Sequence, residues 1–454
     1  MTLWLSKDIA KATNGDAKSD FAVEGLSIDT RTLQKNDLFV ALKDVRDGHD
    51  YIEQALNAGA AGVVAEKIIG DAPTVLVTDT RRALEDLGLA GRERSKALRI
   101  AVTGSVGKTS VKEALATMFE AFGKTHKSQK SFNNHLGAPI TLATMPQETK
   151  FGIFELGMNH SGELTELSRQ VRPQIALIMN VHGAHLANFE NVEGIARAKA
   201  EIVKGLESNG TLILNGDNPH TPFIKSLAEG RNILTFGSNA DNDVVIVSTN
   251  SHPAGGNVRL RVGFQQIDVT LSVPGEHWFS NAAACICVAK AANIDLRKAA
   301  MGLRKVGVPQ GRGDVHELSL GGSTFMLIDE SYNANPTSMR AAFSAAALKT
   351  GRKIAILGDM AELGADELKF HAELASPLKE ADFKRVIVKG EAMRALRGAL
   401  PQSLRAAWTD TIDEAFDALK QEIQDGDIVL VKGSNSTQLG KLVERLKEGR
   451  ENAL

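Results

Sequence analysis

Short apolar runs separated by polar turns and amphipathic stretches recur along the whole chain. In its middle part the apolar runs lie at 98–103, 151–156, 175–181 and 211–214, and most are followed by a helical pattern. Runs rich in Ile, Val and Leu without polar alternation are typical of a parallel sheet covered on both faces. The pattern therefore predicts an α/β fold with a central mononucleotide-binding sheet.

The last part of the chain shows a second alternation of strand and helix. Apolar runs at 325–329, 353–357, 385–388 and 427–431 are each followed by a helical run. This pattern predicts a doubly wound, Rossmann-like domain. No GxGxxG sequence follows its first strand, so a dinucleotide ligand is not indicated.

The first 95 residues contain shorter apolar runs and no phosphate-binding loop, which predicts a small α/β domain. Residues 232–274 alternate in a way that favours antiparallel strands, and a glycine-flanked arginine, Arg312, follows in a polar connection. We expect three domains, at residues 1–95, 96–312 and 313–454.

Charge and cysteine content narrow the class of protein. Lys and Arg number 53 against 55 Asp and Glu, giving a net charge of -2, so no basic field indicates a nucleic-acid partner. The start of the chain lacks the features of a secretion signal, and no apolar run approaches the ~20 residues of a membrane span. Cys285 and Cys287, the two cysteines, are expected to be core residues. We expect a cytoplasmic, monomeric protein.

A glycine-rich turn joins the apolar run 98–103 to the helical pattern after it. Glycines let backbone N–H groups face an anion, and the helix N-terminus adds its positive dipole. The positive charge of Lys108 can bind the terminal phosphates of a nucleotide, and the Thr109 hydroxyl can ligate magnesium. The general pattern has four residues between its glycines and this loop has two, so a chance Gly-Lys-Thr in a polar loop is the alternative. The residues expected at the nucleotide are Gly104, Ser105, Val106, Gly107, Lys108, Thr109 and Ser110.

Other polar residues follow the strands of the central sheet. Glu155 ends one apolar run, His185 follows another, and Lys199 lies in a helical pattern. A carboxylate beside a nucleotide loop is a ligand that magnesium prefers, whereas histidine is an unusual one. A single His at a sheet edge more often caps a helix or makes a hydrogen bond, and a single Lys in a helix is usually solvated. From the residues alone, His185 and Lys199 can therefore be either site residues or ordinary structural ones.

Polar clusters in the outer domains admit two interpretations. In the first domain they are Ser27, Asp29 and Arg31, then Asp47 and His49; turn chemistry alone explains such residues. In the last domain, three polar segments follow strands, at 329–336, 358–364 and 432–436. Three segments at one sheet edge indicate a binding face, although loops at sheet edges are polar by default.

Taken together, these segments resemble the Mur ligase family, whose members form amide bonds with ATP in peptidoglycan precursor synthesis. The resemblance spans nearly the whole chain, and the short phosphate loop is similar to the family's own variant. Within the family, the most similar member joins D-alanyl-D-alanine to UDP-N-acetylmuramoyl-tripeptide. The motifs that indicate this member are Asp47-Gly-His-Asp-Tyr51, Asn333-Ala-Asn-Pro-Thr-Ser338, Leu357-Gly-Asp-Met-Ala-Glu-Leu-Gly364 and Val431-Lys-Gly-Ser434.

The resemblance implies ATP and two magnesium ions as ligands of the central domain. Thr109 and Glu155 would hold one ion and His185 the second, while Lys199 matches a lysine that the family carries as a carbamate. Lys108, Lys199 and His185 would be the catalytic residues. Positions implied at the nucleotide outside the loop are Asn281, Arg312, Asp329, Tyr332, Asn333 and Asn335.

The resemblance also implies two small-molecule substrates. The UDP group would bind the first domain through Ser27, Asp29, Arg31, Asp47 and His49. The loop 124–137, with Asn133, Asn134 and His135, would reach the muramyl peptide, and Lys432 and Ser434 would meet the dipeptide. Asn435 stands where these ligases typically carry Arg.

Three alternatives accompany this reading. Another family member adds the third-position diamino acid, but its Asp-Asn-Pro-Arg signature is absent, since the only Asp-Asn-Pro is followed by His220. Folate polyglutamate ligases share the central fold but not this first domain. A non-catalytic protein that uses ATP as a switch is the third alternative, and the carboxylate, His and Lys around one phosphate loop argue against it.

Overall fold

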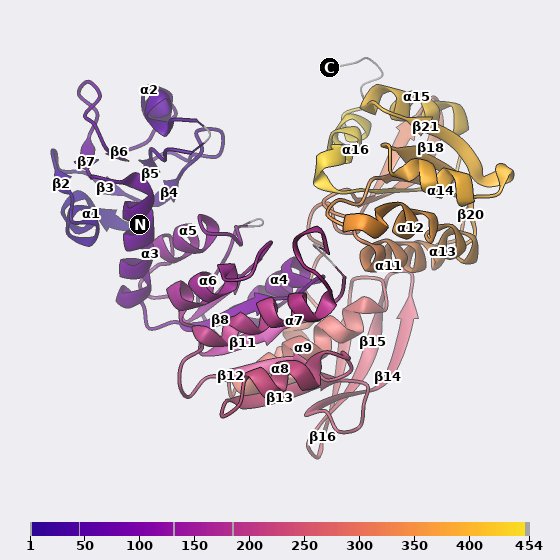
Figure 1. Cartoon of the computed structure of the whole chain (residues 1–454), viewed down its shortest axis with the longest axis horizontal. Helices are drawn as coiled ribbons and strands as arrows, with labels where there is room; N and C mark the ends of the chain where they lie inside the picture. Colours follow the sequence, from indigo (N-terminus) through magenta and orange to yellow (C-terminus); the bar gives the residue numbers. More distant parts are fainter. Residues whose placement is uncertain (1, 45, 130–131, 184–185, 450–454) are drawn as a thin grey trace.

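The computed structural model describes residues 2–44, 46–129, 132–183 and 186–449. Three groups of elements, each built on one main sheet with its own helices, follow one another along the chain, and the first and last groups both rest on the central one (Figure 1). In that view the N-terminal and C-terminal groups stand apart from each other. The expected α/β architecture is therefore confirmed.

The central sheet has nine strands in the order β16-β15-β14-β13-β12-β11-β8-β10-β9. Its strands are β8 (Leu98–Thr103), β9 (Thr125–Lys127), β10 (Phe151–Glu155), β11 (Ile175–Ile178), β12 (Thr211–Asn215), β13 (Asn232–Gly237), β14 (Val244–His252), β15 (Gly255–Val262) and β16 (Gln265–Leu271). Strands β8 to β13 pair in parallel, and β8, β10, β11 and β12 are the predicted apolar runs. Strands β14 to β16 form the expected antiparallel extension, but β13, which lies in the segment expected to be antiparallel, pairs in parallel with both β12 and β14.

Helices cover both faces of this sheet and bury two apolar cores. One core lies under α4 (Lys108–Glu120), α9 (His277–Ala291) and α10 (Leu296–Leu303). The other lies under α5 (Gly137–Ala143), α6 (Glu163–Val171), α7 (Val192–Ala200) and α8 (Thr221–Leu227). Cys285 and Cys287 are buried in α9 as free thiols, so the expectation of core cysteines is confirmed. Because β8, β10 and β11 are adjacent and parallel, their carboxyl ends meet at one edge of the sheet.

The C-terminal sheet has six strands in the order β17-β18-β22-β19-β20-β21, parallel except for β17. Its strands are β17 (Asp314–Leu320), β18 (Ser323–Glu330), β19 (Lys353–Gly358), β20 (Phe383–Lys389), β21 (Arg405–Thr409) and β22 (Ile428–Lys432). Its helices are α11 (Pro336–Ala347), α12 (Glu367–Ala372), α13 (Ala375–Glu380), α14 (Met393–Ala399), α15 (Ile412–Glu422) and α16 (Leu439–Lys447). The four predicted strands are confirmed, and they direct their carboxyl ends toward the central group.

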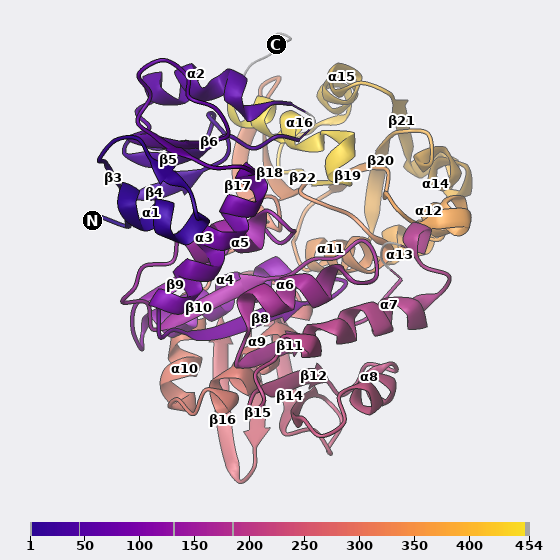
Figure 2. The ribbon, with the colours of Figure 1, turned by 60° about the vertical axis from the view of Figure 1, so that its left-hand side comes forward.

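The N-terminal group is a five-stranded sheet, β2-β7-β6-β5-β4, with a two-stranded pair, β1-β3, beside it. Its strands are β1 (Trp4–Leu5), β2 (Asp16–Ala17), β3 (Ala22–Val23), β4 (Gly25–Ser27), β5 (Asp37–Val40), β6 (Gly62–Ala65) and β7 (Thr74–Leu76); its helices are α1 (Ser6–Thr13), α2 (Ile52–Asn57) and α3 (Thr80–Arg94). Helix α3 lies against α5 of the central group (Figure 2). No helix of the described residues is both long and apolar enough to cross a bilayer.

Candidate active site

The phosphate loop is a tight turn between β8 and α4. Gly107 adopts φ 84°, a left-handed conformation, and caps α4. Gly104 lies so close to β11 that a Cβ there would be 2.9 Å from Met179 Cβ. Asn180 holds the turn from the end of β11: its Oδ1 accepts from Val106 N at 3.0 Å and its Nδ2 donates to Val106 O at 3.2 Å. The loop is therefore preformed for an anion.

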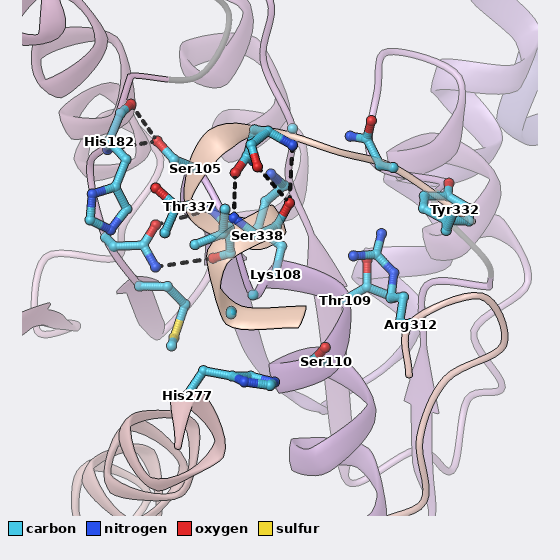
Figure 3. A pocket seen from close by; sticks show the side chains of 18 of the residues that line it. Ser105, Lys108, Thr109, Ser110, His182, His277, Arg312, Tyr332, Thr337 and Ser338 are labelled. Atoms are coloured by element: carbon cyan, nitrogen blue, oxygen red, sulfur yellow. Dashed lines mark hydrogen bonds between the residues drawn. The ribbon is translucent and has the colours of Figure 1, made fainter. Parts of the chain in front are cut away.

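Two further contacts fix the ends of this turn. Ser105 Oγ donates to His182 O and accepts from His182 N, each at 3.0 Å (Figure 3). Lys108 Nζ donates to Gly104 O at 2.7 Å, across the mouth of the loop. Burial lowers the pKa of Lys108, Glu155 opposes this shift, and Arg312 adds to it. The geometry puts an ammonium group and the N-terminus of α4 beside the place where a terminal phosphate would lie.

Thr109 and Glu155 form the candidate magnesium site. Thr109 Oγ1 donates to Glu155 Oε2 at 2.9 Å, and Asn133 Nδ2 donates to Glu155 Oε1 at 2.9 Å. Glu155 is 1% exposed. A hydroxyl and a carboxylate beside a phosphate loop form an oxygen donor set that fits Mg²⁺, which takes one or two carboxylates plus phosphate oxygens.

The described residues contain no group of three or more His, Cys, Asp or Glu side chains that could hold a metal ion by themselves. His185, expected as the ligand of a second ion, lies outside the described residues.

Lys199 lies in the last turn of α7 and is 2% exposed. Among the described residues, no hydrogen bond or ion pair holds its Nζ. Burial lowers the pKa of Lys199 well below its ordinary value, and repulsion from Lys108 adds to the shift. The usual expectation for a helical lysine, a solvated ammonium, is therefore wrong here, and a neutral amine is favoured.

The C-terminal group forms the opposite wall of the cavity. Arg312 stacks over the ring of Tyr332, with its Cζ 4.3 Å from the ring centre (Figure 3). Asn333 lines the same wall. Asn335 also lines it, but its side chain accepts from Ser338 N and caps α11, so this Asn shapes the wall through the helix it begins.

Asn281 projects from α9 toward the phosphate loop. Its side chain is 5% exposed, and its Oδ1 is 3.4 Å from the place where a Cβ on Gly107 would lie. Within the described part of the chain, its Nδ2 has no hydrogen-bond partner. A buried donor without an acceptor is costly, so this amide fits a ligand that brings an acceptor, such as an adenine ring.

These walls enclose a cavity of about 590 Å³ between the central and C-terminal groups. The expected residues that line it are Ser105, Val106, Gly107, Lys108, Thr109, Ser110, Asn133, Asn134, Glu155, Asn281, Arg312, Tyr332, Asn333, Asn335 and Lys432. A cavity of this size holds a nucleotide and the reacting end of a second substrate.

Two comparisons with known proteins agree over most of this chain. Residues 102–289 match the Mur ligase middle domain, and residues 311–435 match the family described as "Mur ligase, glutamate ligase domain". A Rickettsia prowazekii protein named "UDP-N-acetylmuramoyl-tripeptide--D-alanyl-D-alanine ligase" is 32% identical over 453 residues, covering 97% of this chain and 99% of the relative. This chain belongs to the Mur ligase family.

Other similar proteins include further Mur ligases and their structures. The Escherichia coli K12 protein of the same name is 35% identical over 442 residues, with 96% of each chain covered. The crystal structure of MurF from Acinetobacter baumannii superposes with a TM-score of 0.84 at 29% identity, covering 98% of this chain and 99% of the other. The Thermotoga maritima MurF ligase, solved in complex with ADP, gives a TM-score of 0.77 at 25% identity, covering 94% and 98%.

Several expected residues of this Mur ligase lie elsewhere than in the main cavity. Asp329 lines a neighbouring interdomain cavity of about 660 Å³ and accepts from Ser331 Oγ at 2.6 Å. Ser434 is buried and accepts from Ala361 N at 2.8 Å. His135 is exposed beside α5 and does not line the main cavity.

The first-domain residues of the Mur ligase also lie away from the main cavity. Asp29 pairs with the exposed Arg31 at 2.6 Å, and Ser27 Oγ accepts from Asp29 N at 3.1 Å. His49 is 2% exposed; its Nδ1 meets Asp47 at 2.5 Å and its Nε2 accepts from Glu66 N at 2.9 Å. These contacts order the two turns, and their binding role stays a prediction.

Several cavity residues were not among the expected ligands, and Asn180, His182, Glu330 and His277 are among them. Asn180 and His182 follow β11, and their place at a strand end, as for Glu155, is the signal that could have found them. Glu330 lies one residue beyond the predicted strand, and Lys432 Nζ donates to its Oε2 at 3.0 Å. His277 lies one helical turn before Asn281; burial lowers its pKa, Glu330 opposes the shift and Lys432 adds to it.

Proposed function

We propose that this Mur ligase joins D-alanyl-D-alanine to UDP-N-acetylmuramoyl-tripeptide, with hydrolysis of ATP to ADP and phosphate, to make the UDP-muramyl-pentapeptide of peptidoglycan synthesis. One observation favours this member of the family over the others. The similarity to relatives named "UDP-N-acetylmuramoyl-tripeptide--D-alanyl-D-alanine ligase" covers nearly the whole chain, so it includes the N-terminal group as well as the two matched domains. The cavity supplies the chemistry that the reaction needs.

The first step is attack by the terminal carboxylate of the muramyl peptide on the γ-phosphorus of ATP. It forms an acyl phosphate and releases ADP. Two anions must approach each other, so the site has to neutralise charge. Lys108 and the N–H groups of the phosphate loop hold the transferred phosphoryl group. Thr109 and Glu155 would hold magnesium, which would supply further neutralisation of charge on the phosphate oxygens.

In the second step the amine of D-alanyl-D-alanine attacks the acyl carbon, and phosphate leaves. The acyl phosphate must be kept from water until the amine arrives. The C-terminal group supports this requirement, because Arg312 and Tyr332 line the same cavity as the phosphate loop and Lys349 Nζ donates to Pro253 O at 2.6 Å across the two groups. Closure of the C-terminal group would complete the site.

Lys199 is proposed as a carbamate in the active enzyme. Carbon dioxide adds to a neutral amine, and burial keeps this amine neutral at a pH where an exposed lysine would be charged. The carbamate would be an anion opposite Lys108, and with His185 it would hold a second magnesium ion.

The substrates would enter from opposite sides. The UDP group would occupy the turns around Ser27 and Asp47, Asn133 and Asn134 would meet the muramyl peptide, and the strand ends of the C-terminal sheet, near Lys432, would receive the dipeptide. The enzyme would act as a monomer in the cytoplasm, without a nucleic-acid partner.

Phosphate release from ATP tests this proposal. The assay contains magnesium, UDP-muramyl-tripeptide and D-alanyl-D-alanine, each omitted in turn, and mass spectrometry identifies the product. We expect release to need all components and to yield the pentapeptide. Release with a single amino acid in place of the dipeptide would point to another family member, and ATP binding without any amide product would point to a switch protein.

A further inference from the structure

Lys112 is a buried cation that the proposed reaction does not use. It lies on α4 one helical turn after Lys108, and its side chain is fully buried. Its Nζ donates to Ser128 O at 2.8 Å and lies 3.0 Å from Glu113 Oε1 and 3.9 Å from Glu155 Oε2. A buried ammonium is retained only where partners compensate for lost hydration.

A local ion pair with Glu113 does not account for this burial. Glu113 also pairs with Lys127, which is 40% exposed and reaches the same carboxylate from β9. Lys127 can neutralise Glu113 at the surface without the cost of burying a second cation. Glu113 is thus shared between two cations, and Glu155 is a second carboxylate near Lys112 Nζ, so the buried ammonium is linked to the candidate magnesium carboxylate.

Ser128 links Lys112 to the segment that precedes α5. Its carbonyl accepts from Lys112, while its Oγ accepts from Glu155 N at 3.2 Å. Further along this segment, Asn133 Nδ2 donates to Glu155 Oε1 and Asn133 O accepts from Gly157 N at 2.7 Å. The strand end that carries Glu155 is therefore tied at several points to the segment expected to meet the muramyl peptide.

We propose that Lys112 is a positioning residue that holds Glu155 in one arrangement with Ser128 and Asn133, so that magnesium and the muramyl peptide bind cooperatively. The inference rests on the proposed function, because that function supplies both ligands. Residues that orient a metal-binding carboxylate typically change metal affinity about 10- to 100-fold when they are lost. Cooperativity between the two ligands is reciprocal by thermodynamic linkage.

Three variants of the full-length chain separate positioning from charge. Lys112→Met removes the ammonium. The double variant Lys112→Met/Glu113→Gln removes it together with one carboxylate and so keeps the net charge. Lys127→Met is the matched control, because it removes a cation from the same cluster but leaves the contacts to Ser128 and Glu155.

Binding of Mn²⁺, without turnover, is the first measurement. Mn²⁺ is titrated calorimetrically into each protein in the presence of one equivalent of AMP-PNP. We expect the double variant to bind Mn²⁺ about 10- to 100-fold more weakly than the wild type, and Lys127→Met to stay within about twofold of it. Thermal unfolding checks that each protein is folded. If Lys112→Met does not fold, the Mn²⁺ affinity of the double variant tests the proposal.

The second measurement is the affinity for UDP-muramyl-tripeptide with and without Mn²⁺. The wild type should bind it more tightly with the metal, and the double variant should lose this difference. Unchanged Mn²⁺ affinity in the double variant, or an equal loss in Lys127→Met, would overturn the proposal. Amide synthesis by the wild type is assayed separately, so failure of the proposed function would be distinguishable from failure of this inference.

Discussion

Thr109 and Glu155, which lie 46 positions apart in the sequence, meet side by side at the edge of the central sheet, with Thr109 Oγ1 donating to Glu155 Oε2 at 2.9 Å. One residue opens α4 and the other ends β10, so the pair exists only because β8 and β10 are parallel neighbours. The hydroxyl and the carboxylate are therefore held together before a metal arrives, and binding requires little rearrangement.

Replacing Thr109 by Val should lower the activity without unfolding the protein. The substitution keeps the volume of the side chain but removes the hydroxyl, so the metal loses a ligand and Glu155 loses a donor. We expect kcat to fall at least about 100-fold, or ~2.7 kcal/mol of transition-state stabilisation. Steady-state kinetics over a range of Mg²⁺ concentrations measure this. Thr109→Ser, which keeps the hydroxyl, should retain most of the activity, and a Val variant with an unchanged Mg²⁺ response would remove Thr109 from the metal site.

Lys199 should form a carbamate at neutral pH. Because burial lowers its pKa, the amine is neutral under conditions where an exposed lysine is protonated. Carbon-13 NMR with labelled bicarbonate should show a carbamate signal in the wild type that is lost in Lys199→Ala, together with most of the activity. Lys204, exposed in the next turn, is the control: Lys204→Gln should keep the signal. A signal that survives in Lys199→Ala would contradict the assignment.

Asn281 should contribute to nucleotide binding and not to the stability of the fold. Its buried Nδ2 lacks a partner within the described residues, so removing it relieves an unmet hydrogen bond in the free protein. We expect Asn281→Ala to weaken AMP-PNP binding about tenfold, or ~1.4 kcal/mol, while Tm of the free protein stays the same or rises. Calorimetry measures the AMP-PNP affinity, and thermal unfolding measures Tm. A fall in Tm without a change in affinity would show that the amide is structural.

His126 should make the protein sensitive to mild acid. Burial lowers its pKa from 6.5 to about 4, and its Nε2 lies 2.8 Å from Thr141 O. Its folded pKa is below its unfolded pKa, so the unfolded chain takes up the proton first as pH falls from 6.5 to 4. Stability should therefore be unaffected above pH 6.5 and should fall by roughly 3 kcal/mol across that window.

Thermal unfolding between pH 7.5 and 4.5 tests this expectation, with His126→Gln as the comparison. The Tm of the wild type relative to that of the variant should be lowest at the acid end of the range. A difference that does not change with pH would show that the imidazole does not titrate on unfolding.

The sequence predicted the strand ends well because apolar runs without polar alternation leave few alternatives to parallel strands. Glu155 and the phosphate loop follow such runs directly, and they meet as expected. Side-chain direction beyond a strand end is harder to predict: Glu330 lines the main cavity while its neighbour Asp329 lines the adjacent one, because successive residues in β18 point to opposite faces.

Contacts between residues far apart in the sequence were not predictable from it. The stacking of Arg312 on Tyr332 and the bonds from Asn180 to Val106 depend on three-dimensional packing that no local pattern encodes. The burial of Lys199 is a similar case: its helical pattern alone favours a solvated side chain, and only the tertiary structure buries the amine and lowers its pKa.

The packing of α3 against α5 has a mechanical consequence. Gly88 and Gly91 bring the two helices so close that a Cβ at Gly91 would lie 2.3 Å from Leu142 O. Arg94 Nη2 donates to Ala143 O and Met145 O at 3.1 and 2.9 Å, and Ile140 and Ala143 of α5 fill the apolar core of the N-terminal sheet. The first two groups are therefore joined along a close helix–helix contact, and we expect them to behave as one rigid unit toward which the C-terminal group closes.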